Sequence, residues 1–181
     1  LKNGIDKKEI KKDKGYLHLS AKLHDVGKIA ISDLLLKKPE RFNDSEFNSM
    51  KYHTVYGAQL FYNSKSELDK MSTEISLRHH ERWDGKGYPG KIGNIHRKTE
   101  NIKFSKGLKG EEIPIFARIV RIADVYDALM SKRVYKNAWK EKDCLDYLEK
   151  NKGTEFDPDL VDYFFDIYGT IKSIQNKYQE H

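Results

Sequence analysis

Apolar residues recur at helical spacing in one segment of this 181-residue chain after another, and that rhythm most constrains its fold. Leu17, Ser20, Ala21 and His24 share one such stripe. Further helices are predicted over residues 43–61, where Asn43 and Glu46 form a capping box, over 68–82, from Pro114 onward, and over 142–151 and 158–168. Strand signals are weak throughout. The pattern predicts an all-α, single-domain helical bundle.

Composition limits the chain to one compact interior. Hydrophobic residues make up 38% and charged residues 34%, while 12% aromatic residues argue against disorder. No apolar run approaches the roughly 20 residues that span a bilayer, and no signal peptide is evident, so we expect no membrane contact from this segment. The single cysteine, Cys144, cannot form an internal disulfide, which favours a reducing compartment such as the cytoplasm.

The net charge of +6 is compatible with two kinds of surface. Lysine-rich stretches at residues 2–14 and 91–109 supply much of the excess, and a solvated surface explains them on composition alone. The alternative is an anionic partner such as a nucleotide or phosphodiester. No basic strand interleaved with aromatic residues is present, so a nucleic acid polymer is not expected.

Histidine and aspartate accompany the apolar stripes. His24 and Asp25, His53, His79 and His80, and Asp124 are predicted on or at the ends of four helices, listed here in chain order. Imidazole and carboxylate together suit zinc, iron, manganese or nickel, and a bundle brings such groups together. Each residue also has a plain structural interpretation. A lone histidine is commonly a satisfied core residue, Asp124 could pair with Arg121, and adjacent histidines suit a helix C-terminus.

The stretch "HDVGK" at residues 24–28 is more specific, because Gly27 permits close backbone approach and Lys28 adds a charge. The motifs that follow are "LHDVGKIAISD" (23–33), "LLKKPERF" (35–42), "MKYH" (50–53), "HHERWDGKGYP" (79–89), "GLKGEEIPIFARIVRIADVYDALMSKRVYK" (107–136) and "FDPDLV" (156–161). In this order the chain resembles the HD-GYP domains of the HD phosphohydrolase superfamily, from about residue 17 to 168. The resemblance implies one HD-GYP domain over residues 1–181.

That resemblance implies a bacterial, metal-dependent phosphodiesterase. It would hydrolyse cyclic di-GMP to pGpG or GMP by attack of a hydroxide that bridges two metal ions. By motif position the metal ligands would be His24, Asp25, His53, His79, His80 and Asp124, with iron or manganese as the expected ions. Asp25 would bridge the ions and take part in catalysis together with Lys28.

The resemblance also assigns substrate contacts. Lys28, Arg133 and Lys136 occupy phosphate-binding positions, and Tyr88 would meet a guanine or its phosphate. Asp127, three residues after Asp124, would orient a ligand histidine. Exposed helix-end charges are the plain alternative for Arg133 and Lys136.

The chain departs from the family pattern in several places. The family carries a further histidine on an earlier helix; this ligand-bearing helix is expected to be absent here, and a third metal ion with it. Ser32, Glu40 and "SKRVY" (131–135) replace the usual residues. A polar insertion at residues 91–106 is predicted to be a surface excursion, either decoration, a lid or a partner-binding loop.

These departures leave two alternatives to an active cyclic di-GMP phosphodiesterase. One is a non-catalytic signalling module that binds a cyclic dinucleotide or a regulatory protein through the GYP face. The other is a phosphohydrolase that acts on another cyclic dinucleotide. Base preference, regulatory input and oligomeric state are not readable from these residues.

Overall fold

The computed structural model describes residues 7–63, 65–95, 102–131 and 139–179. Its elements are α1 (Lys7–Lys22), η1 (Val26–Ala30), α2 (Asp33–Leu36), α3 (Asp44–Lys51), α4 (His53–Phe61), α5 (Glu67–Arg78), η3 (Gly110–Glu112), α6 (Ile115–Met130), α7 (Glu141–Lys150), α8 (Pro158–Asp166) and α9 (Tyr168–Gln179). The described residues form no β-strand beyond one isolated bridge between Lys152 and Phe156. The predicted all-α fold is therefore confirmed.

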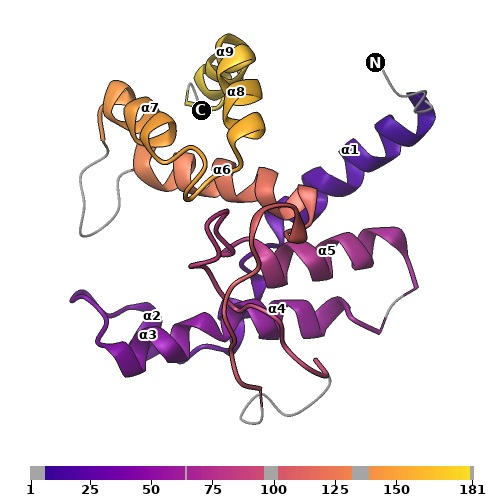
Figure 1. Cartoon of the computed structure of the whole chain (residues 1–181), viewed down its shortest axis with the longest axis vertical. Helices are drawn as coiled ribbons and strands as arrows, with labels where there is room; N and C mark the ends of the chain where they lie inside the picture. The colour runs from indigo at the N-terminus through magenta and orange to yellow at the C-terminus, as the bar shows by residue number, and fades with distance from the viewer. Residues whose placement is uncertain (1–6, 64, 96–101, 132–138, 180–181) are drawn as a thin grey trace.

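Helix α6 crosses the middle of the molecule (Figure 1). Helices α4 and α5 lie side by side below it, and α7, α8 and α9 gather above it. Helix α1 packs on α5 through a buried contact between the hydroxyls of Ser20 and Ser72, whose oxygens are 2.9 Å apart. Small side chains at this contact let the two helices approach closely, and this sets the position of the chain that leaves α1.

Apolar side chains from the two halves of α6 pack in two different clusters of the core. Val120 of α6 packs with Met71 and Ile75 of α5, and Tyr16, Leu17 and Ala21 of α1 cover this cluster. The second half of α6 enters a larger cluster with α7 and α8, formed by Ile122, Tyr126, Leu129, Cys144, Leu148, Phe156, Val161 and Phe164. Helix α6 is therefore shared by two parts of the core.

The predicted helix over residues 43–61 is divided in two. Its capping box is present, since Asn43 Oδ1 accepts from the Glu46 amide at 2.9 Å and the Glu46 carboxylate accepts from the Asn43 amide. Helix α3 ends at Lys51, however, and α4 begins at His53 after the single residue Tyr52. This break leaves backbone carbonyls that side chains can use, as the site shows below.

The C-terminal region differs from the prediction as well. A helix was predicted over residues 158–168, but α8 ends at Asp166 and α9 follows from Tyr168. The Asp157 side chain caps α8 by accepting from the amides of Asp159 and Leu160.

The segment at residues 91–106 is not merely a surface excursion where it is described. Ile95 and Ile102, each 5% exposed, are buried against Val55, Ala58 and Leu77. The Tyr52 hydroxyl donates to the Ile102 carbonyl at 2.9 Å, and Gln59 Nε2 donates to the Ile95 carbonyl at 2.7 Å. Both ends of the insertion are thus fastened to the α3–α4 region.

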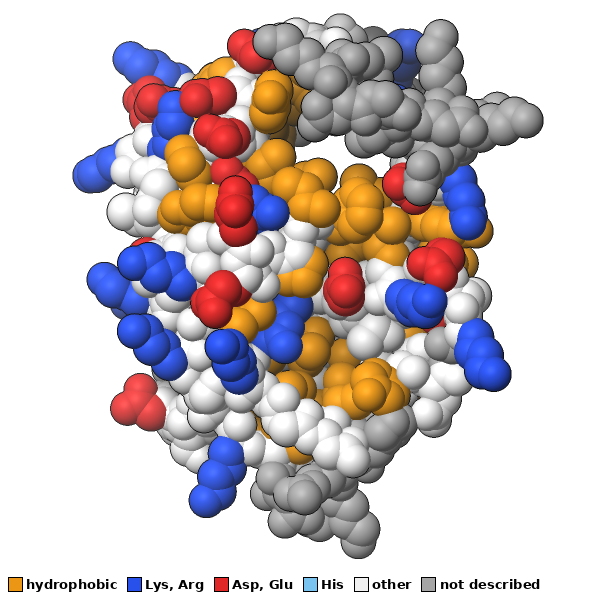
Figure 2. Space-filling view, turned by 45° about the vertical axis from the view of Figure 1, so that its right-hand side comes forward, with side chains coloured by type: hydrophobic (Ala, Val, Ile, Leu, Met, Phe, Trp, Pro, Cys, Tyr) orange, Lys and Arg blue, Asp and Glu red, His pale blue; other side chains and the backbone are white. Residues whose placement is uncertain are grey.

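Charged side chains of both signs lie on the face in Figure 2. Lysine and arginine stand mainly along its two sides, most of them on the left, with acidic groups among them, and apolar side chains fill the middle. None of the described helices combines the length and apolarity needed to cross a membrane.

Candidate metal centre

The histidines of the site lie where helices end or begin. His24 follows α1, His53 is the first residue of α4, and His79 and His80 directly follow α5. Asp25 precedes η1, while Asp124 lies within α6. Four separate helices therefore deliver polar side chains to one place.

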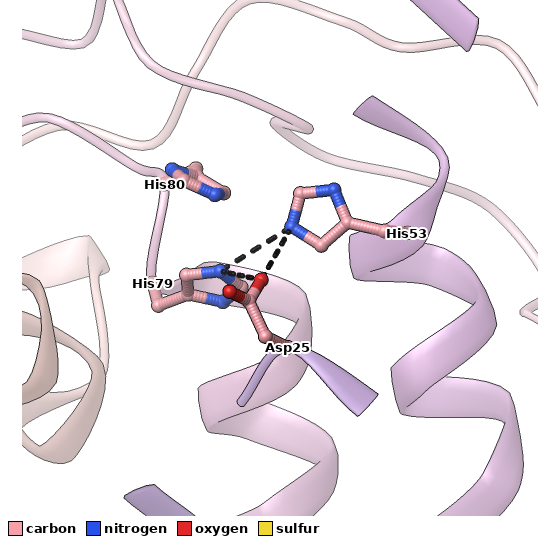
Figure 3. Close-up of side chains that lie close together, drawn as sticks. All are labelled: Asp25, His53, His79 and His80. Atoms are coloured by element: carbon pink, nitrogen blue, oxygen red, sulfur yellow. Dashed lines mark hydrogen bonds and ion pairs between the residues drawn. The ribbon is translucent and has the colours of Figure 1, made fainter. Parts of the chain in front are cut away.

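The carboxylate of Asp25 points toward His53 and His79 (Figure 3). Ligand atoms of Asp25, His53, His79 and His80 all lie within 4.8 Å of one another. Asp25 Oδ1 is 3.4 Å from His53 Nε2 and 3.7 Å from His79 Nε2, and those two nitrogens are 3.4 Å apart. One carboxylate oxygen thus faces two imidazole nitrogens.

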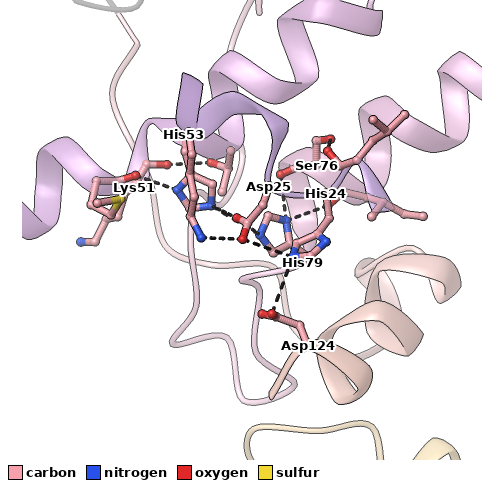
Figure 4. Close-up of polar contacts among 12 residues, drawn as sticks. His24, Asp25, Lys51, His53, Ser76, His79 and Asp124 are labelled. Carbon is pink, nitrogen blue, oxygen red and sulfur yellow. Dashed lines mark hydrogen bonds and ion pairs between the residues drawn. The ribbon is translucent and has the colours of Figure 1, made fainter. Parts of the chain in front are cut away.

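The other side of Asp25 faces His24 and, beyond it, Asp124 (Figure 4). His24 Nε2 is 3.4 Å from Asp25 Oδ2 and 3.6 Å from Asp124 Oδ1. The two oxygens of Asp25 consequently face different histidines. This is the geometry that a carboxylate needs to contact two cations at once.

Backbone carbonyls orient three of the rings. His24 Nδ1 lies 2.6 Å from the Ala21 carbonyl oxygen, His53 Nδ1 lies 2.7 Å from that of Met50, and His79 Nδ1 lies 3.0 Å from those of Ile75 and Ser76. A carbonyl only accepts, so each Nδ1 carries the proton. In a neutral ring Nε2 then carries a lone pair that can bind a metal ion. All three Nε2 atoms point into the site.

The local chain explains these contacts. The carbonyls of Ala21 and Ile75 belong to the last turns of α1 and α5, and that of Met50 lies just before the break at Tyr52. Carbonyls at helix ends lack some of their usual intrahelical partners. A histidine three or four residues later on the chain can therefore reach them.

The electrostatics of the site differ from one histidine to the next. Burial alone would lower the pKa of His24, but the carboxylates of Asp124 and Asp25 raise it to about 10. The pKa of Asp25 is held well below its usual range, because His24, His79 and Lys28 outweigh its burial. His53 and His80 face fewer anions, so burial lowers their pKa, to about 4 for His53.

The residues present fit a metal ion. Among the described side chains, His24 Nε2 and Asp25 Oδ1 are buried with no hydrogen-bond partner, which is costly unless a cation satisfies them. The atoms available to bind a metal ion are imidazole nitrogens and carboxylate oxygens, and this set suits zinc, iron, manganese and nickel. This cluster is a candidate metal centre because it is buried, because two of its polar atoms have no hydrogen-bond partner, and because main-chain contacts fix the orientation of its rings.

Glu81 braces the loop that follows the paired histidines. It is 1% exposed, and its two oxygens accept from the amides of Gly90 at 2.7 Å and Leu108 at 2.9 Å. Arg78 donates to the same carboxylate at 3.2 Å and also to the Gly90 carbonyl. Burial raises the pKa of Glu81, and these donors oppose that shift. Glu81 was not predicted as a site residue, although it directly follows His80 in the sequence.

The other predicted site residues fall in different places. Lys28 donates to Asp25 Oδ2 at 2.5 Å, and Tyr88 stacks on His80 with ring centroids 4.8 Å apart and an interplanar angle of 21°. Asp127 is exposed and lies in a groove between α6, α8 and α9, so the structure does not bring it to the histidines. Arg133 and Lys136 lie outside the described residues.

The plain alternatives for two residues are also resolved. Arg121 pairs with Glu155 at 2.5 Å, so it is not the partner of Asp124. Helix α6 presents Asp124 to the site, whereas Asp127 lines the groove between α6, α8 and α9. Backbone carbonyls perform the orienting role that was predicted for Asp127.

Comparison with known proteins identifies the family of the chain. The model of the HD domain family matches residues 3–129. The "Cyclic di-GMP phosphodiesterase response regulator RpfG" of Xanthomonas campestris is 42% identical over 159 residues, covering 88% of this chain and 37% of the relative. The "3'3'-cGAMP-specific phosphodiesterase 2" of Vibrio cholerae is 39% identical over 153 residues, covering 84% and 26%. A "Cyclic di-GMP phosphodiesterase" of Thermotoga maritima is 36% identical over 161 residues, covering 89% and 39%.

The chain therefore spans between about a quarter and two fifths of the length of these relatives. The family match covers most of the chain and includes every residue of the metal centre. By this match and by its helical fold, the chain belongs to the HD domain family.

Proposed function

We propose that this domain is a metal-dependent phosphodiesterase that hydrolyses cyclic di-GMP to pGpG or GMP. The observation that carries the proposal is the convergence of three imidazole Nε2 atoms on a carboxylate whose two oxygens face different histidines. Relatives named cyclic di-GMP phosphodiesterases support the choice of substrate.

His24, His53, His79, His80, Asp25 and Asp124 would hold two divalent ions, with Asp25 between them. Bound ions of this kind lower the pKa of a coordinated water and offset negative charge on a phosphoryl group. Iron and manganese are the proposed ions, because both accept mixed imidazole and carboxylate ligands.

The chain's own residues prepare the site for an anionic substrate. Lys28, beside Asp25, offers an ammonium to a phosphate oxygen. Tyr88 lies flat on His80 and so keeps a ring and a hydroxyl next to the ligands. Glu81 holds the loop that carries Tyr88, because its carboxylate accepts from the amides of Gly90 and Leu108.

We place the reaction in the bacterial cytoplasm, since a chain with the single cysteine Cys144 suits a reducing compartment.

The first test compares two substitutions. Asp25→Asn should reduce bound metal below one ion per chain and lower turnover of cyclic di-GMP by more than about 100-fold. Loss of a residue that only supports a ligand typically costs no more than about 100-fold. Lys28→Ala should keep the metal and raise KM about 10-fold or more, as expected for loss of a charge-assisted hydrogen bond. Metal is measured by elemental analysis and products by chromatography on the same oxygen-free samples. Full metal content and full rate in Asp25→Asn would refute the assignment.

A second candidate substrate is 3'3'-cGAMP, because one relative of 39% identity is named as specific for it. The same assay with both dinucleotides decides between them. A higher kcat/KM for 3'3'-cGAMP than for cyclic di-GMP would favour the second candidate. Full metal content with tight binding of either nucleotide and no turnover would instead indicate a binding module.

A further inference from the structure

A row of rings leads outward from the metal centre and ends at a lysine. Tyr88 stacks on His80, and the Phe47 ring packs edge-on against Tyr88 with centroids 6.1 Å apart. Lys51 Nζ lies 4.7 Å from the Phe47 centroid and 5.7 Å from that of Tyr88. Figure 4 shows Lys51 at the end of the side-chain cluster furthest from Asp124.

These side chains are accessible and yet held in place. Phe47 is 44% exposed, which is unusual for so large an apolar ring, and Tyr88 and Lys51 are partly exposed. Phe47 and Lys51 lie one turn apart on α3, whose start is fixed by the capping box of Asn43 and Glu46. Glu46 is held in turn by Lys38, which donates to it at 2.7 Å.

We propose that Phe47, Lys51 and Tyr88 form a purine-binding subsite that prefers guanine; this rests on the proposed function, since the phosphate of the same nucleotide must lie at the metal centre. An aromatic face accepts any nucleobase by stacking. In the absence of a base the Lys51 ammonium lies over the two rings and donates to Asn48 Oδ1 at 2.9 Å, and a stacked base would draw it from these contacts toward the base edge.

The lysine is the element that selects between purines. An ammonium group only donates hydrogen bonds. Guanine presents two acceptors, O6 and N7, along one edge, whereas adenine presents N7 beside an amino donor. Lys51 therefore matches guanine and meets a like donor on adenine. Base identity matters here, because the relatives differ in it by name.

The test measures kcat and KM for cyclic di-GMP, cyclic di-AMP and bis(p-nitrophenyl) phosphate, a diester without a purine. Phe47→Ala should raise KM for cyclic di-GMP about tenfold, the lower end for loss of one base–aromatic stack, and Phe47→Trp should restore it. Lys51→Met should lower the preference for cyclic di-GMP over cyclic di-AMP by about tenfold. Both variants should hydrolyse the purine-free diester as the wild type does.

Matched controls lie elsewhere on the surface. Tyr163 of α8 is an aromatic residue that is 65% exposed, and Lys70 of α5 is an exposed lysine paired with Glu67. Tyr163→Ala and Lys70→Met should leave all three substrates unaffected. Unchanged kinetics in Phe47→Ala and Lys51→Met would overturn the subsite. An equal loss on all three substrates would overturn it too, because the residues would then merely support Tyr88.

Failure of the proposed function is distinguishable from failure of the subsite. A metal-replete wild type that hydrolyses none of the cyclic dinucleotides refutes the function. Equilibrium dialysis with GMP and AMP then tests the subsite by itself. Preferential GMP binding that is lost in both variants supports it, and equal binding of GMP and AMP by the wild type refutes it.

Discussion

At the scale of single residues, hydrogen bonds to the main chain decide what the side chains of the site can do. Three histidines donate a hydrogen bond from Nδ1 to carbonyls at helix ends, and Glu81 accepts hydrogen bonds from two backbone amides of the following loop. The motifs that the chain shares with HD-GYP domains indicated which histidines and aspartates gather, whereas Asp127 was expected beside them and lies elsewhere. Their tautomers and supports could not be predicted, because these depend on where each helix stops.

Glu81 gives the prediction that belongs to this scale. Glu81→Ala leaves the amides of Gly90 and Leu108 buried without an acceptor, at a cost of about 3 kcal/mol. The melting temperature should fall by roughly 6 to 12 °C for a domain of this size. Differential scanning calorimetry measures this shift.

Two further variants test the explanation for Glu81. Glu81→Gln keeps the shape and one acceptor oxygen, so its loss should be intermediate. Glu111→Gln, at an exposed glutamate of η3, should change the melting temperature by no more than about 2 °C. A Glu81→Ala protein that melts like the wild type would contradict the bracing role.

At the scale of elements, the contact of η1 with α4 keeps Asp25, which precedes η1, close to His53, which begins α4. A methyl group added at Gly27 would overlap the His53 carbonyl and the Gly57 amide nitrogen. Gly27 was expected to permit close backbone approach, and the structure shows the backbone that it approaches.

Gly27→Ala should therefore separate η1 from α4 and draw Asp25 away from His53. We expect a loss of about 1 to 3 kcal/mol in stability, as for an overpacked core, together with weaker metal binding. Urea unfolding and elemental analysis measure the two effects.

The control substitution for this prediction should change the stability in the opposite direction. Gly15 lies within α1, and an added methyl there meets nothing within 4 Å. Gly15→Ala should stabilise the protein by up to about 1 kcal/mol through helix propensity. Equal stability of the two variants would show that the η1–α4 contact is slack.

Other features of the elements were beyond prediction for physical reasons. A helical stripe continues across Tyr52, so nothing in its period marks the break between α3 and α4. The few apolar residues of the segment at 91–106, among them Ile95 and Ile102, follow no helical or strand period that would indicate burial. The hydrogen bonds that fasten them involve their backbone carbonyls, which side-chain patterns do not reveal.

At the scale of the whole molecule, the site is assembled from helices that lie far apart in the chain. The cluster joins the ends of α1, α4 and α5 to α6, so an ion bound there would link these four helices. A ligand that binds only the folded state stabilises it by mass action.

Metal should therefore raise the melting temperature of protein prepared with a chelator. At a free concentration 100 times Kd the gain is about 2.7 kcal/mol, or roughly 5 to 10 °C for this size of domain. Calorimetry with added Mn²⁺ measures it, and His53→Ala should show a much smaller rise. An identical melting temperature with and without metal in the wild type would contradict a structural contribution from the ion.

The placement of the histidines at helix ends has a consequence for how the chain can change in length. One residue inserted into α5 would turn everything beyond it by about 100°, and His79 would then face away from Asp25. The connection between α4 and α5 carries no such penalty, since no ligand depends on its length. Insertions and deletions among natural variants of this domain should accumulate in such connections, while the number of residues from mid-helix to each histidine stays constant.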